Sequence, residues 1–163
     1  MSIVLDDGFV VFLLDLGSGV GITRSVERVE MNTWHNVTVL RSGGEVVLHV
    51  DTQTVTVSVS GPGQLSLGQQ LWVGGVSDLM SLPATLSSNI LTGYQGCLAS
   101  LTINSLPVQL QYSALAMVSV TSCDHRTPET LVTPSVRSPL QHSVPSFRGR
   151  SYLAFNNSDI YSK

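Results

Sequence analysis

The chain has 163 residues, of which 42% are hydrophobic, so it is long enough for one domain with a buried core and an extension. Residues 1–123 carry three arginines and eight acidic side chains, a net charge of −5, which argues against nucleic acid or an anionic membrane as a general partner. No apolar run reaches the roughly 18–20 residues that a helix needs to cross a bilayer, and no basic stretch with an apolar core marks a signal peptide at the N-terminus.

Short strands separated by turns are predicted along the first half of the chain. Apolar residues and Thr alternate with polar residues there, and Gly, Pro, Ser and Asn interrupt the runs. Turns are expected at Asp6-Asp7-Gly8, Gly17-Ser18-Gly19 and Gly61-Pro62-Gly63, because Gly and Pro favour turn conformations. The predicted strands cover residues 9–14, 34–41, 45–51 and 54–59, the last with a clear period of two.

The second half continues the same pattern, with strands predicted at residues 71–73, 97–103, 108–110 and 117–121. No segment shows a helical apolar stripe with caps. Many short strands between turns predict an all-β fold, an antiparallel sandwich of jelly-roll type. Trp34 and Trp72 are expected in its core, because aromatic side chains usually pack between the two sheets.

The composition changes after Cys123. Residues 124–146 hold four prolines among Ser, Thr, His and Arg, which predicts an extended linker. Residues 147–155, Phe-Arg-Gly-Arg-Ser-Tyr-Leu-Ala-Phe, indicate a return to strand.

Several motifs resemble, in their order, those of the laminin G-like domain family, which occurs in laminin α chains, perlecan, agrin and neurexins. They are Asp15-Leu16-Gly17-Ser18-Gly19, Trp34-His35-Asn36-Val37-Thr38-Val39-Leu40-Arg41, Val50-Asp51, Leu71-Trp72-Val73-Gly74-Gly75, Tyr94-Gln95-Gly96-Cys97 and Cys123. The resemblance implies that residues 1–123 are about the C-terminal two-thirds of such a domain, a sandwich that lacks its first strands. Residues 147–163 resemble the family's opening strand, so they either begin a following domain or complete the first one.

The resemblance also implies a disulfide between Cys97 and Cys123, whereas two cysteines without that context are often buried thiols. Many family members bind calcium, which needs hard oxygen ligands. This chain offers Ser58 and Ser60 and no carboxylate near residues 57–61, so neither a metal nor another cofactor is expected. Asn36 and Asn156 begin sequons for N-glycosylation, which requires passage through the secretory route.

No catalytic constellation is evident, because the chain has no nucleophile elbow and no phosphate-binding loop. The family resemblance implies a non-catalytic module, secreted or in the matrix, that binds protein receptors or glycans. Two alternatives stay open. One is a truncated fragment with little independent function. The other is a lectin-like sandwich that processes carbohydrate, which would need two convergent carboxylates about 5–10 Å apart.

Overall fold

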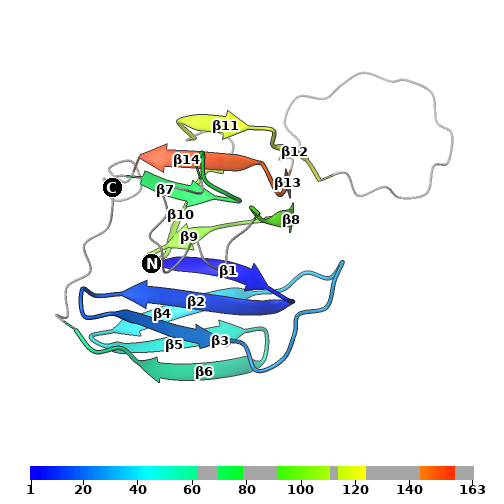
Figure 1. The fold of residues 1–163 in the computed structure, drawn as a ribbon. Helices are drawn as coiled ribbons and strands as arrows, with labels where there is room; N and C mark the ends of the chain where they lie inside the picture. The colour runs from blue at the N-terminus through cyan, green and yellow to red at the C-terminus, as the bar shows by residue number, and fades with distance from the viewer. Residues whose placement is uncertain (62–69, 79–91, 111–113, 124–143, 157–163) are drawn as a thin grey trace, which may run out of the picture. The chain divides into compact units, whose positions relative to one another are not determined.

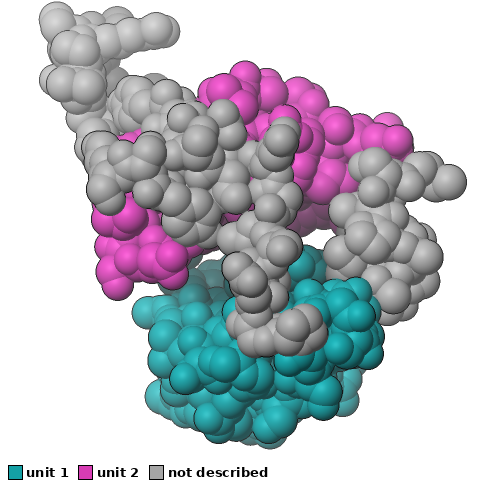
Figure 2. Space-filling model, turned by 90° about the vertical axis from the view of Figure 1, so that its left-hand side faces the viewer, with its two compact units in different colours: residues 1–68, 80–91 teal, residues 69–79, 92–163 magenta. Residues whose placement is uncertain are grey.

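The computed structural model describes residues 1–61, 70–78, 92–110, 114–123 and 144–156. Every regular element in these ranges is a β-strand, and every strand pairing is antiparallel (Figure 1). The predicted all-β class is therefore confirmed. The chain divides into two compact units, unit 1 of residues 1–68 and 80–91 and unit 2 of residues 69–79 and 92–163 (Figure 2). No helix in the described ranges has the length and apolar character needed to span a bilayer.

Unit 1 contains two three-stranded sheets. The first has the order β1 (Ser2–Asp6), β2 (Phe9–Asp15), β3 (Val20–Arg24), and the second has the order β4 (Val37–Ser42), β5 (Glu45–Val50), β6 (Gln53–Ser58). Side chains of a strand alternate between its two faces, so each sheet can turn one apolar face inward. The core joins alternate residues of β2 and β5 with two flanking residues: Val10, Phe12, Leu14, Leu16, Val46, Leu48, Val50 and Val59.

Tight turns connect the strands of unit 1 where the sequence predicts them. Asp7 and Gly8 both have positive φ, 47° and 81°, between Asp6 and Phe9, which are paired in register. Two successive residues of positive φ are typical of the hairpin turn that matches the twist of the strands, and an Asp-Gly pair suits it well.

Unit 2 also contains two three-stranded sheets. One has the order β11 (Ala116–Val118), β14 (Tyr152–Asn156), β7 (Gln70–Val73), and the other has the order β12 (Thr121–Ser122), β13 (Pro145–Arg148), β8 (Gln95–Cys97). A separate pair is formed by β9 (Thr102–Ile103) and β10 (Leu106–Pro107). The buried core is formed by Val73, Leu110, Phe147, Leu153 and Phe155.

Two predicted strands of this half are wrong in their extent, and a third is absent. Within residues 97–103, Cys97 ends β8 and Thr102–Ile103 form β9, with no strand between them, and residues 117–121 contain parts of β11 and β12. Ser119 has a positive φ of 52°, which interrupts an extended strand. Residues 108–110 are not a strand. Asn104 and Ser105, with φ of 51° and 65°, instead turn the chain earlier, into β10.

The two tryptophans differ in their surroundings. Trp72 is half-buried in β7, and its ring meets that of Tyr152 edge to face, with centroids 5.2 Å apart. Trp34 is 50% exposed, so the prediction that it lies in the core is wrong. It precedes β4 and therefore lies outside the two sheets whose facing side chains form the core of unit 1.

Candidate functional site

A shallow hollow of about 240 Å³ opens on the surface of unit 1. It is lined by the turn from β2 to β3 and by the end of β6, through Ser18, Gly19, Val20, Gly21, Ser58, Val59 and Ser60. The turn is held by Asp15, whose Oδ1 accepts a hydrogen bond of 2.8 Å from the amide of Gly17. The end of β6 is held by the amide of Val59, which donates to the carbonyl oxygen of Gly44 at 2.7 Å. Both walls of the hollow are thus anchored to the strands.

The hollow is uncharged. Its three serine hydroxyls can each donate and accept a hydrogen bond. Ser58 and Ser60 lie where the family resemblance would have placed a calcium ligand, and no carboxylate lines the hollow. Within the part of the chain that the structure describes, no three His, Cys, Asp or Glu side chains are grouped to hold a metal ion. The chemistry of the hollow is therefore that of a neutral hydrogen-bonding surface.

His35 connects the segment before β4 to the turn between β5 and β6. Its Nδ1 lies 2.7 Å from Oδ2 of Asp51, and its Nε2 lies 2.8 Å from the carbonyl oxygen of Glu30. Both partners are acceptors, so the imidazolium, which donates from both nitrogens, satisfies them together. The hydrogen bonds to Asp51 and to Glu30 raise the pKa of His35, and the hydrogen bond from His35, with that from the amide of Asn36, lowers the pKa of Asp51.

The asparagines of the two sequons lie at strand ends. Asn36 directly precedes β4 and is exposed, and its Oδ1 accepts a hydrogen bond of 3.4 Å from Oγ1 of Thr38. An exposed asparagine at a strand end is open to modification. Asn156 is the last residue of β14, in register with Gln70, and the rest of its sequon lies outside the described residues.

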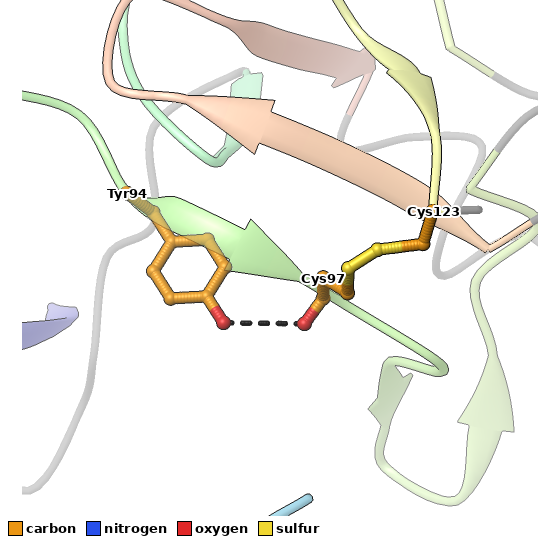
Figure 3. Close-up of a disulfide and its surroundings, with 3 residues drawn as sticks. All are labelled: Tyr94, Cys97 and Cys123. Carbon is orange, nitrogen blue, oxygen red and sulfur yellow. Dashed lines mark hydrogen bonds between the residues drawn. A yellow bond between two sulfur atoms is a disulfide. The ribbon is translucent and has the colours of Figure 1, made fainter. Parts of the chain in front are cut away.

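The structure joins Cys97 and Cys123 by a disulfide, and their Cα atoms are 6.1 Å apart. Cys97 ends β8, and Cys123 follows β12 (Figure 3). The hydroxyl of Tyr94 donates to the carbonyl oxygen of Cys97 at 3.1 Å. Because β8 and β12 are the outer strands of one sheet, the disulfide connects the two sides of that sheet around β13.

Sequence reasoning did not single out the hollow or the pairing of His35 with Asp51. The residues concerned were in view, since Ser18, His35 and Asp51 all belong to the family motifs. Those motifs indicate the fold of the family, but they do not specify which of their side chains contact one another in the folded chain. The proximity of Ser18 to Ser58 depends on the contact between β3 and β6, which no local pattern predicts.

Known proteins resemble this chain over much of its length. The family model described as Laminin G domain matches residues 1–109. Neurexin-2 of Mus musculus is 39% identical over 107 residues, which cover 63% of this chain and 6% of neurexin-2. Pikachurin of Rattus norvegicus is 24% identical in an alignment of 197 residues that covers all of this chain and 19% of pikachurin. The chain thus spans less than a fifth of the length of these relatives, and no solved structure gives a significant match.

Proposed function

Because this chain belongs to the laminin G domain family, we propose that it is a non-catalytic module that binds protein receptors or glycans outside the cell. Laminin G domains are non-enzymatic binding modules, and proteins that contain them, such as the relatives above, are extracellular or cell-surface proteins. The net charge of −5 over residues 1–123 favours partners that are not polyanions.

The observation that carries this proposal is the serine-lined hollow of unit 1. Ser18, Ser58 and Ser60 present hydroxyls on a surface held by strands, and a rigid support keeps binding groups in position. Neutral hydroxyl groups complement the hydroxyls of an uncharged sugar or the backbone of a protein loop, because each can donate and accept. We assign the first contact with the partner to this hollow.

The test is binding by the purified chain on a glycan array and in a pull-down from matrix proteins. Ser60→Tyr places a ring in the hollow, and Thr52→Tyr adds the same ring at the exposed turn between β5 and β6. We expect Ser60→Tyr to weaken binding by about tenfold, a change of roughly 1.4 kcal/mol, and Thr52→Tyr to leave it unchanged. Equal binding by both variants would reject the hollow, and hydrolysis of any glycan would favour the carbohydrate-processing alternative.

The linker was predicted for residues 124–146, but β13 begins at Pro145, within that range. We further propose that the linker ends before this strand and that β13 and β14 complete unit 2. The support is that each of these strands pairs on both sides, β13 with β8 and β12 and β14 with β7 and β11. Deletion of residues 144–163 is then expected to lower the thermal stability of unit 2, as followed by the near-UV circular dichroism of Trp72. An unchanged transition would contradict this assignment and favour the start of a separate domain.

A further inference from the structure

The β13–β14 segment, residues 144–156, is central to unit 2. It supplies the middle strand of both three-stranded sheets, and within the described residues the outer strands of each sheet pair only with it. Further backbone hydrogen bonds extend the pairing at both ends. The amide of Cys123 donates to Val144 at 2.7 Å, the amide of Leu98 donates to Pro145 at 3.1 Å, and the amide of Leu115 donates to Ala154 at 2.7 Å. The outer strands of the two sheets, β7 and β11 in one and β8 and β12 in the other, therefore form a slot whose hydrogen-bonding edges face the segment on both sides.

The slot fits the side chains of this segment closely. A Cβ atom added at Gly74 would overlap the ring of Phe147, and one added at Gly75 would lie 2.9 Å from the carbonyl oxygen of Ser151. Ser151 is buried, and its hydroxyl donates to the carbonyl oxygen of Ser119 at 2.8 Å. The glycines and Ser119 belong to the slot, so the slot recognises the side chains and backbone of the segment.

Two of the strands that form the slot are linked to each other independently of the segment. The Cys97–Cys123 disulfide joins β8 to the end of β12, which are the two walls on either side of β13. This bond keeps these walls attached to each other when the segment leaves. The covalent connection from Cys123 to the segment is residues 124–143, a length of chain that can span at most about 70 Å.

We propose that the slot of unit 2 also accepts the β13–β14 segment of a second copy of this chain, so that two copies pair by reciprocal strand exchange. This inference rests on the proposed completion of unit 2 by its own segment. Each exchanged segment makes the same contacts that it makes in its own chain, so the two forms differ mainly in the entropy of the connection. A tether that joins two binding groups gives an effective concentration of about millimolar, so we expect exchange to become favourable when copies are crowded to that level.

The test uses paired cysteines on neighbouring strands of full-length chains. Ala116 on β11 and Ala154 on β14 are partners in register, so cysteines at these positions can join only where the two strands pair. Chains carrying Ala116→Cys and chains carrying Ala154→Cys are mixed at about millimolar concentration, briefly unfolded in urea with the native disulfide intact, refolded and oxidised. Non-reducing gels and peptide mass mapping then count the links between residues 116 and 154. Gln70→Cys with Asn156→Cys, also partners in register, repeats the test on the other side of β14.

We expect linked dimers from the mixed single variants, with a yield that falls at least tenfold when the refolding concentration is reduced to about micromolar. The control mixes Ala154→Cys with Ser42→Cys, an exposed position in unit 1, and reports random collision. A chain that carries both Ala116→Cys and Ala154→Cys should link within itself at low concentration. If it does so while both mixed pairs stay at the level of the control, strand exchange is wrong and the completion of unit 2 stands. If neither this chain nor one that carries both Gln70→Cys and Asn156→Cys links internally, the completion of unit 2 by its own segment is wrong, and strand exchange is rejected with it.

Discussion

Gly74→Ala tests the close packing of Gly74 against Phe147 in unit 2. Gly74 follows β7 with a φ of 84°, and the added Cβ would overlap the ring of Phe147, which is 2% exposed. A left-handed backbone costs an ordinary residue about 1–2 kcal/mol, and forcing a methyl group into a packed core costs about 1–3 kcal/mol more. We expect the free energy of unfolding of unit 2 to fall by about 2–5 kcal/mol, a large part of the roughly 5–15 kcal/mol typical of a domain.

The assay is equilibrium unfolding in guanidinium chloride, followed by fluorescence and near-UV circular dichroism. Gly17→Ala is the control, because Gly17 has a similar φ of 91° and an added Cβ there meets no atom within 4 Å. It should lose only the backbone part, about 1–2 kcal/mol. Phe147→Leu removes the ring, so combining it with Gly74→Ala should cost less than the sum of the two single changes. Equal losses for the two glycine variants, or strict additivity of Gly74→Ala and Phe147→Leu, would show that Gly74 and Phe147 do not pack as the structure has them.

Three further outcomes are expected. Replacing Cys97 and Cys123 together by Ala removes a link between residues 26 positions apart, and on the chain-entropy model it should destabilise unit 2 by about 3.5 kcal/mol. Unfolding curves that coincide with those of the unreduced parent would contradict this prediction. The pKa of His35 is raised by its pairing with Asp51, so the pair stabilises the fold fully below about pH 6.5 and less as the pH rises through the folded pKa. The pKa of Asp51 is lowered by the same pairing, so the stabilisation is also lost in acid, as the pH falls below the usual Asp value of 3.8. Thermal unfolding from mildly acidic to alkaline pH should therefore show a loss of stability that His35→Gln lacks, and an NMR titration of His35 with a midpoint at or below 6.5 would count against it. Expression in secretory cells should give a glycosidase-sensitive mass increase at Asn36 that Asn36→Gln abolishes, because the side chain is exposed.

The strands were predicted best where their partners are near in the chain. The hairpins of β4, β5 and β6 follow one another through short turns, and period-two alternation located β5 and β6 within a residue or so. Prediction failed for residues 97–103, where β13, some fifty residues further along, pairs with β8 at Cys97 and the chain leaves the sheet soon after. The prediction that Trp34 is buried failed because burial depends on which residues face a side chain in the fold, and the residue type alone does not specify them.

The all-β class, the laminin G family and the sequon at Asn36 could be predicted from the sequence, because alternation, turn residues and motifs are local patterns. Three features became visible only in the folded chain: Ser18, Ser58 and Ser60 line one hollow, His35 contacts Asp51, and β13 and β14 are the middle strands of two sheets. Each of these contacts joins residues distant in the chain. Such contacts depend on sheet register and on the close approach of glycines such as Gly74 to their neighbours, which no single stretch of sequence specifies.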